Sequence, residues 1–373
     1  MGAIQANGKN KWRIRIELDR DPITLERNFY RETVTGTKHD ANKRVVELEH
    51  QLNNGTIINP SNYSVAELMT DWLKDHAKPN TRRTTYDGYA MMASTHIIPA
   101  LGAIPLHKLQ PSHVQSYYTQ KLESGLSNRT VKHHHRVLSQ AIKYGVGLQR
   151  VGRNVCDSVK APVVKNKEMN PLDEYQVNAF LDSVKDHRFY NFFHLAVNTG
   201  MRRSELLGLR WKDIDDLNIY ISQVLHQAKG GEIIIEEPKT EKSRRRIDIA
   251  PSTALELSRY REYKEAMNGD DLVFTDYKGV PFKTSSISRS FNTALKNLGI
   301  DGVRFHDLRH THATLMLKQN VNPKIIQERL GHSSITVTMD IYGHVMPSMQ
   351  KDAVMNFADL LKQAREEDLS KVG

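Results

Sequence analysis

The C-terminal half of the sequence contains the motif His306-Asp307-Leu308-Arg309-His310-Thr311-His312. A spacing of three residues predicts that His306 and Arg309 lie on one face of a helix. A guanidinium group donates paired hydrogen bonds in a planar fork that matches the oxygens of a phosphate. An arginine and a histidine directed at one point therefore suit a phosphodiester. Buried His–Arg pairs also occur in helices that bind nothing, so this motif must be weighed with the segments around it.

Three more segments carry polar side chains at expected turns or helix ends. They are Thr199-Gly200-Met201-Arg202-Arg203-Ser204-Glu205-Leu206-Leu207, Pro238-Lys239-Thr240, and Leu330-Gly331-His332-Ser333-Ser334, which Tyr342-Gly343-His344 follows. Gly331 after Leu330 is typical of a helix C-terminus, which predicts that His332 lies in a tight turn. Ser334 is then a suitable N-cap for a short helix that displays Tyr342.

Each of these segments also has a simpler interpretation. His306, His310 and His312 are potential metal ligands, but no HExxH-like pattern accompanies them. A lone tyrosine such as Tyr342 most often packs with its hydroxyl at the surface. We therefore expect no metal and no other cofactor.

The composition favours an anionic partner. The 373 residues include 53 Lys and Arg against 43 Asp and Glu, a formal net charge of +10. Each neutralised phosphate releases a condensed counterion, so this excess suits a polyanionic partner, with a merely soluble basic protein as an equal alternative. Cys156 is the only cysteine, which excludes a disulfide framework. The sequence has no membrane-length apolar run and no signal-peptide core, so we expect a cytoplasmic protein without a membrane partner.

Taken together, the segments resemble the signature of the tyrosine recombinase (phage integrase) family. That signature is an arginine in a TGxR-SEL context, a lysine in a β-turn, HxxR, a histidine in LGH and a tyrosine about ten residues later, all in this order here. The resemblance is close from Pro171 to about Met346. It implies a site-specific recombinase that cuts and rejoins DNA through a 3′-phosphotyrosyl intermediate, without a metal ion or ATP.

The resemblance also implies roles for the matching residues. Tyr342 would attack the scissile phosphate, and Arg202 and Arg309 would hold its non-bridging oxygens as negative charge builds. Lys239 would protonate the leaving 5′ oxygen. The turn lysines Lys229 and Lys242 are alternatives, but the Pro-Lys-Thr context of Lys239 matches the family.

The remaining matches are histidines and an acidic residue. His306 and His332 would hydrogen-bond the phosphate, and His306 is also placed to assist proton transfer from the tyrosine. Glu205 resembles a supporting residue that orients the arginines, with helix capping or surface pairing as equal alternatives. Arg203 is expected to contact the DNA backbone instead.

Residues 1–55 are expected to form a small sheet-and-helix domain that resembles the arm-binding domain of mobile-element integrases. Apolar and polar residues alternate from Trp12 to Leu18, and a second strand is expected at Asn28–Thr35. Asp40 is the expected cap of a helix whose apolar face holds Val45, Val46, Leu48 and Leu52. The basic residues expected on the sheet are Arg13, Arg15 and Arg31, either in a DNA groove or on a solvated face.

Residues 62–160 show a helical pattern and resemble the family's core-binding, SAM-like domain. Ser64 and Glu67 predict a capping box, and further helices are expected at His113–Leu122 and Asn128–Tyr144. The basic residues expected to contact DNA here are Arg129, Lys132 and Arg136, although such charges often form a solvated face.

The fold class expected is therefore multi-domain α+β, with a mostly α catalytic domain at 171–373 after a linker at 161–171. Helices are expected at 173–187, 189–199 and 203–209, and strands of a small antiparallel sheet at 218–226, 232–238 and 244–249. A helix at 351–365 would dock either on its own domain or on a neighbouring protomer.

The function expected is that of an integrase of a phage or integrative mobile element. Its partners would be double-stranded DNA at core-type and arm-type attachment sites, three further copies of itself in a homotetramer, and possible excision and host DNA-bending factors. The alternatives are a chromosome-dimer resolvase, a type IB topoisomerase and a non-catalytic DNA-binding regulator.

Overall fold

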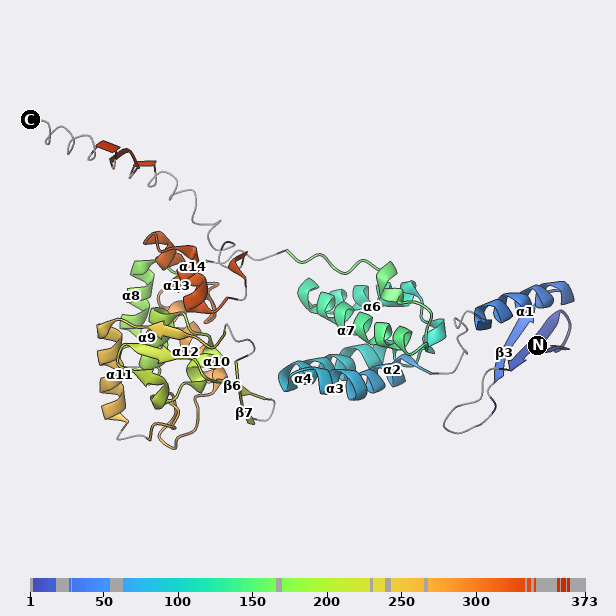
Figure 1. Cartoon of the computed structure of the whole chain (residues 1–373), viewed down its shortest axis with the longest axis horizontal. Helices are drawn as coiled ribbons and strands as arrows, with labels where there is room; N and C mark the ends of the chain where they lie inside the picture. Colours follow the sequence, from blue (N-terminus) through green and yellow to red (C-terminus); the bar gives the residue numbers. More distant parts are fainter. Residues whose placement is uncertain are drawn as a thin grey trace, which may run out of the picture. The chain divides into compact units, whose positions relative to one another are not determined.

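The computed structural model describes residues 3–17, 27, 29–53, 63–165, 170–228, 231–238, 243–264, 268–332, 334–336, 339, 354–355, 357–359 and 361–362. The chain folds into two compact units, Met1–Asn166 and Lys167–Gly373 (Figure 1). Within the described ranges, no helix is both long and apolar enough to cross a lipid bilayer.

The first unit begins with a three-stranded antiparallel sheet of β1 (Ala3–Ala6), β2 (Lys11–Glu17) and β3 (Phe29–Thr35). The predicted alternation is confirmed, because Ile14 and Ile16 are buried while Arg13 and Arg15 are exposed. Helix α1 (Lys38–Asn53) contacts the sheet, and its Val45 and Leu48 join the strand isoleucines in a small core (Figure 1).

Two details of this helix correct the sequence prediction. Thr37 is the capping residue, since its Oγ1 accepts from the backbone N–H of Asp40, while Oδ2 of Asp40 accepts in return from the N–H of Thr37. This reciprocal pair is a capping box shifted by three residues from the expected cap. Val46 is 66% exposed, so only Val45 and Leu48 of the predicted apolar face are described as buried; Leu52 lies outside the described side chains.

The rest of the first unit is helical with its own hydrophobic core. Its elements are α2 (Val65–Asp71), a π-helical turn (Trp72–Ala77), α3 (Lys78–Asn80), α4 (Arg83–Met92), a second π-helical turn (Ala93–Ile97), α5 (Ile98–Leu101), α6 (Pro111–Glu123) and α7 (Asn128–Gly147), with 3₁₀ turns at Leu106–Lys108 and Val155–Ser158. The predicted capping box of α2 is confirmed by reciprocal bonds between Ser64 and Glu67.

The second unit packs helices around small sheets. The helices are α8 (Glu174–Ser183), α9 (Tyr190–Thr199), α10 (Arg203–Gly208), α11 (Pro251–Tyr263), α12 (Thr284–Asn297), α13 (Asp307–Lys318) and α14 (Pro323–Leu330), with a 3₁₀ turn at Trp211–Asp213. Phenylalanines from three helices and the intervening loops fill the core, where Phe180 and Phe291 meet edge to face with ring centroids 5.2 Å apart. The α+β, multi-domain fold class is confirmed.

The predicted single sheet of this unit is in fact two. Strands β4 (Ile214–Asp215), β5 (Asn218–Tyr220) and β8 (Arg246–Asp248) form one sheet, and β6 (Val224–Gln227) and β7 (Ile233–Glu236) form a hairpin. The predicted strand 218–226 breaks where Ser222 and Gln223 use their side chains on Asp213 and on the carbonyl of Gly208. These polar contacts turn the chain from one sheet into the other.

Candidate active site

The candidate site is built at the C-terminal ends of α9 and α14, which both stop at a left-handed glycine. Gly200 has φ +64° and Gly331 has φ +65°. A Cβ on Gly200 would stand 2.5 Å from Cδ2 of Leu330, so the two helix ends approach too closely for any other residue there. The predicted turn at Gly331 is confirmed, and His332 follows it with its N–H bonded to the carbonyl of Gln327 at 3.0 Å.

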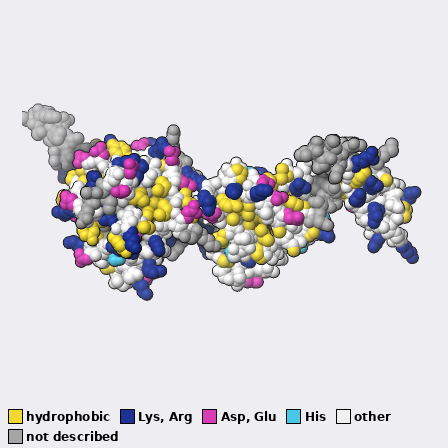
Figure 2. Space-filling view, turned by 90° about the horizontal axis from the view of Figure 1, so that it is seen from below, with side chains coloured by type: hydrophobic (Ala, Val, Ile, Leu, Met, Phe, Trp, Pro, Cys, Tyr) yellow, Lys and Arg dark blue, Asp and Glu magenta, His cyan; other side chains and the backbone are white. Residues whose placement is uncertain are grey.

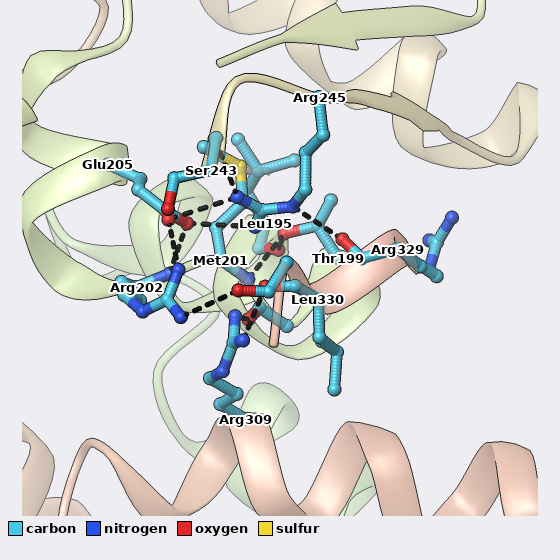
Figure 3. Close-up of polar contacts among 12 residues, drawn as sticks. Leu195, Thr199, Met201, Arg202, Glu205, Ser243, Arg245, Arg309, Arg329 and Leu330 are labelled. Atoms are coloured by element: carbon cyan, nitrogen blue, oxygen red, sulfur yellow. Dashed lines mark hydrogen bonds and ion pairs between the residues drawn. The ribbon is translucent and has the colours of Figure 1, made fainter. Parts of the chain in front are cut away.

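Arg202 and Arg309 converge on these helix ends from different elements (Figure 3). Nη2 of Arg202 donates to the carbonyl of Gly331 at 3.1 Å. Arg309 donates from Nη1 to the carbonyl of Gly200 at 2.9 Å and from Nη2 to that of Leu330. The last carbonyls of a helix lack partners within the helix and carry partial negative charge, so cations at this position satisfy and stabilise them.

Glu205 lies behind the arginines and is 2% exposed. Its Oε1 accepts from Nη1 of Arg202 at 2.7 Å, and its Oε2 accepts from the backbone N–H of Arg202 at 2.8 Å. Glu205 therefore caps α10 and also orients Arg202. Because it is buried, the alternative of a surface ion pair is wrong. Arg245 binds the same carboxylate with two nitrogens, at 3.0 and 2.9 Å.

The cluster carries excess positive charge. Arg202, Arg245 and Arg309 face one carboxylate, Glu205, whose pKa falls to about 2 because the bonds and charges of Arg245 and Arg202 outweigh the opposing effect of burial. Burial and the neighbouring charge of Arg202 lower the pKa of Arg309, whose guanidinium nevertheless stays protonated at neutral pH. A buried cation that lacks its full counter-charge favours the binding of an anion.

His306 and His332 border the same cluster. Loss of surrounding water, followed by the charges of His310 and Arg309, lowers the pKa of His306 to about 4, although the residue as a whole is exposed. Loss of water and the charges of Arg309 and Arg202 lower the pKa of His332 to about 3. Both imidazoles are therefore neutral at pH 7 and able to share or accept a proton when an anion enters.

His312 has a structural role. Its Nδ1 contacts the carbonyl of Val197 at 2.9 Å, and its Nε2 faces Nε of Arg329 at 3.0 Å. Because a carbonyl only accepts and a guanidinium only donates, the proton must sit on Nδ1. Both ring nitrogens are thus engaged, and no group of three or more potential metal ligands occurs among the described residues.

Two predicted catalytic residues, Lys239 and Tyr342, lie outside the described residues. Around Lys239, the described residues stop at Pro238 and resume at Ser243. On the Tyr342 side, the N–H of Thr336 donates to Oγ of Ser334 at 3.1 Å, as predicted for a helix beginning there. The predicted helix at 351–365 is described only at 354–355, 357–359 and 361–362, where Val354, Phe357 and Leu361 are exposed.

The residues expected to contact DNA occupy other surfaces. Arg203 donates to Oγ of Ser288 on α12 at 2.9 Å. On the N-terminal sheet, Arg15 and Arg31 are direct neighbours on β2 and β3 and both lie over the Phe29 ring, at 3.7 and 5.8 Å. Lys and Arg side chains are prominent on this domain at the right of Figure 2.

A groove of about 1030 Å³ runs beside α7 in the helical domain. The basic residues along it are Arg129, Lys132 and Arg136, all exposed and spaced to lie on one helix face. His134 is fully buried below them, with Nδ1 2.9 Å from the hydroxyl of Tyr117. None of the described residues that line the groove carries a carboxylate, which suits a polyanion.

Sequence inspection missed Arg245 and Arg329. Arg329 bridges His312, the carbonyl of Asp248 at 2.7 Å and that of Asn198 at 3.1 Å. Arg245 alternates in phase with Ile247 and Ile249, which are buried. An arginine at an inward strand position predicts an internal ion pair, so this signal was present in the sequence.

Known proteins share both the fold and the segments that build the site. Residues 170–349 match the family model described as the phage integrase family, and residues 64–122 match the phage integrase N-terminal SAM-like domain. The helical domain, the mixed α/β domain and the arginine cluster together define a tyrosine recombinase. The chain belongs to the phage integrase family.

Relatives align along nearly the whole chain. The ICEBs1 integrase of Bacillus subtilis is 27% identical, over 94% of this chain and 98% of the relative. The integrase of Staphylococcus phage L54a is 26% identical, over 82% of this chain and 96% of the relative. Among solved structures, the Tn1549 transposon integrase in complex with a circular intermediate DNA matches with a TM-score of 0.69 and 23% identity, covering 79% of this chain and 99% of that one.

Proposed function

We propose that this tyrosine recombinase is the integrase of a phage or integrative mobile element, acting on DNA attachment sites as a tetramer. The alignment with the ICEBs1 integrase over 94% of this chain supports the mobile-element assignment. The lambda integrase, solved as a tetramer bound to a Holliday junction, has a TM-score of 0.60 over 91% of this chain at 18% identity, which supports the same fold. The proposed site of action is the cytoplasm, where excision and DNA-bending factors would be additional partners.

The observation that carries the proposal is the excess positive charge where Arg202 and Arg309 meet the ends of α9 and α14. A scissile phosphate there would receive hydrogen bonds from both guanidinium groups. Negative charge grows on the non-bridging oxygens as the pentacoordinate transition state forms, so fixed cations stabilise it more than the ground state. This is the contribution that bound metal ions make in other phosphoryl-transfer enzymes.

In the proposed reaction, the phenol oxygen of Tyr342 attacks phosphorus and the bond to the 5′ oxygen breaks. The phenol proton passes to a neutral acceptor, the role proposed for His306, whose lowered pKa leaves it unprotonated at pH 7. Lys239 gives a proton to the departing 5′ oxygen, which leaves as a hydroxyl. The 3′-phosphotyrosyl ester conserves the energy of the broken bond, and attack by the 5′ hydroxyl of another strand reseals the DNA and frees the tyrosine.

A nicked suicide substrate tests the proposal. Core-site DNA from the circular form of the element that encodes the chain is nicked close to the cleavage position, so that the short 5′ fragment diffuses away after cleavage. The expected result is a detergent-stable protein–DNA adduct with the full chain and none with Tyr342→Phe. Tyr263→Phe, at a tyrosine 82% exposed in the same unit, is the matched control. DNA binding by the wild type without an adduct would instead identify a non-catalytic regulator.

The need for DNA sequences outside the core site distinguishes an integrase from a chromosome-dimer resolvase. An integrase with an N-terminal DNA-binding domain should need arm-type sequences outside the core to recombine two sites. Deletion of residues 1–55 should then abolish recombination while core-site cleavage continues. Recombination by that deletion variant on core sites alone would favour the resolvase.

A further inference from the structure

His312 and Arg329 together hold the last turn of α9. Nδ1 of His312 donates to the carbonyl of Val197 at 2.9 Å, and Nη2 of Arg329 donates to that of Asn198 at 3.1 Å. The last carbonyls of a helix have no partner within the helix, so these two bonds supply what α9 itself lacks. The two side chains are also bonded to each other, because Nε of Arg329 donates to Nε2 of the His312 ring at 3.0 Å.

Both residues lie on elements that also build the arginine cluster. His312 is on α13, three residues after Arg309, and Arg329 is on α14, immediately before Leu330. A spacing of three places Arg309 and His312 on one face of α13. Arg309 donates to the carbonyls of Gly200 and Leu330, so its guanidinium spans the ends of α9 and α14. The separation of these two helix ends therefore decides whether Arg309 can keep both bonds.

Close packing and a third anchor fix that separation. A Cβ on Gly200 would stand 2.9 Å from Cδ2 of His312, so the imidazole packs directly against the backbone at the end of α9. Nη1 of Arg329 donates to the carbonyl of Asp248 on β8 at 2.7 Å. One guanidinium thus joins the end of α14 to α9, to β8 and, through His312, to α13.

The chemistry of the two contacts requires these residue types. Burial and the charge of Arg329 lower the pKa of His312 to about 4, so the ring is neutral at pH 7. A neutral imidazole offers one donor and one acceptor, which match the carbonyl of Val197 and the guanidinium of Arg329. Phenylalanine at position 312 would keep the ring but offer neither group. Lysine at position 329 has one nitrogen and cannot reproduce the planar fork that reaches three acceptors.

We propose that His312 and Arg329 are positioning residues for DNA cleavage, which hold the ends of α9 and α14 at the separation that Arg309 requires. This inference rests on the proposed function, in which Arg309 binds a non-bridging oxygen of the scissile phosphate. In this role neither His312 nor Arg329 contacts a reacting atom. Their effect is to keep the Arg309 guanidinium directed at the phosphate, where negative charge develops as the bond breaks.

A substrate with a methyl group in place of one non-bridging oxygen provides the decisive measurement. This methylphosphonate carries no charge before attack, so its cleavage depends less on the placement of Arg309. Single-turnover adduct formation is measured on the phosphate and methylphosphonate forms of the nicked core-site substrate, for the full-length wild type, Arg309→Lys, His312→Phe and Arg329→Lys. His194→Phe is the matched control, at a partly buried histidine on α9 whose ring lies 5.6 Å from that of Tyr190.

The expected result for His312→Phe is a loss of about 10- to 100-fold on the phosphate substrate, the effect of displacing a reacting group by about 1 Å. This loss should shrink by about tenfold on the methylphosphonate, as should that of Arg309→Lys, because both act on the same charge. His194→Phe should cleave both substrates at the wild-type rate. DNA affinity, measured in a Tyr342→Phe background, should change little for His312→Phe.

Arg329→Lys provides a second, independent test. It should show the same pattern as His312→Phe, with a loss on the phosphate substrate that shrinks on the methylphosphonate. Melting temperatures are recorded for every variant, and Arg329→Lys replaces His312→Phe in the comparison if the latter is unfolded at the assay temperature.

The contrary outcomes are distinct. Wild-type rates for His312→Phe, or equal losses on both substrates while Arg309→Lys is rescued, would reduce His312 and Arg329 to a structural role and overturn the inference alone. Absence of rescue for Arg309→Lys would remove the contact between Arg309 and the phosphate charge, and this inference with it. Absence of any adduct with the wild type would overturn the proposed function itself.

Discussion

Arg202 and Arg309 donate to adjacent carbonyls at the end of α14, those of Gly331 and Leu330. The two arginines are separated by more than a hundred residues and arrive from α10 and α13, yet one helix terminus orients both guanidinium groups. Arg309 is 3% exposed, whereas the side chain of Arg202 is 34% exposed. Under the proposed function, a phosphate that approaches from solvent would meet Arg202 first and reach Arg309 deeper in the same site.

Replacement of Arg309 by lysine should lower single-turnover cleavage by about 10²- to 10³-fold, the usual cost of removing one donor to a developing oxyanion. Lysine retains the charge but cannot contact both helix ends and a phosphate. Arg259→Lys is the control, because Arg259 lies on α11 in the same unit, is exposed and is paired with Glu256 at 2.9 Å. Equal losses in the two variants would show that general charge, not the geometry at the helix ends, supports cleavage.

Gly200→Ala should destabilise the second unit by more than Gly279→Ala. Both positions have positive φ, +64° and +75°, so both substitutions incur a backbone cost of about 1–2 kcal/mol. A Cβ at Gly200 would also stand 2.5 Å from Leu330 and 2.9 Å from His312, whereas nothing lies within 4 Å at Gly279. Overpacking should add about 1–3 kcal/mol, measurable by chemical denaturation. Equal stability of the two variants would mean that α9 and α14 can separate without cost.

The sequence pattern predicted most of the helices and the turn at His332, but not the contacts that hold the arginine cluster together. Local periodicity placed helices at α7, α9 and α10, and the glycine after Leu330 predicted the turn at His332, because these features depend on neighbouring residues. The pairing of Glu205 with Arg245 spans 40 positions, so no local pattern encodes it. The only indication in the sequence was that Arg245 occupies the same face of its strand as the buried residues Ile247 and Ile249.

The wrong predictions have the same origin. The predicted strand 218–226 was apolar enough to continue, yet Ser222 bonds to Asp213, and Gln223 bonds to Gly208. Similarly, Asp40 was preferred as a cap on residue type, whereas Thr37 and Asp40 share the capping through reciprocal bonds. Side-chain bonds to particular distant or neighbouring groups decided both cases.

The second unit should lose stability in mild acid through His332. Its pKa is about 3 in the folded state against 6.5 for the ordinary group. A histidine with a lowered pKa binds fewer protons when folded, so its contribution is complete above pH 6.5 and declines as pH falls toward the folded value. Between about pH 7.5 and about pH 5 the loss is about 2 kcal/mol. Denaturation at both values should show a smaller difference in the free energy of unfolding for His332→Gln than for the wild type. A larger pH difference in His332→Gln would contradict the neutral buried imidazole.

The α7 groove should bind DNA mainly through phosphates. Arg129, Lys132 and Arg136 are exposed on one face of the helix and line a groove where no described residue carries a carboxylate, so each is available to displace a counterion from DNA. Arg136→Gln in a full-length Tyr342→Phe background should reduce the slope of log K against log salt by about 1, with similar weakening on specific and unrelated DNA. Arg83→Gln is the control, since Arg83 is in the same unit but already paired with Asp87 at 3.3 Å. A loss confined to the specific sequence would instead show that Arg136 contacts a base, because a phosphate contact carries no sequence information of its own.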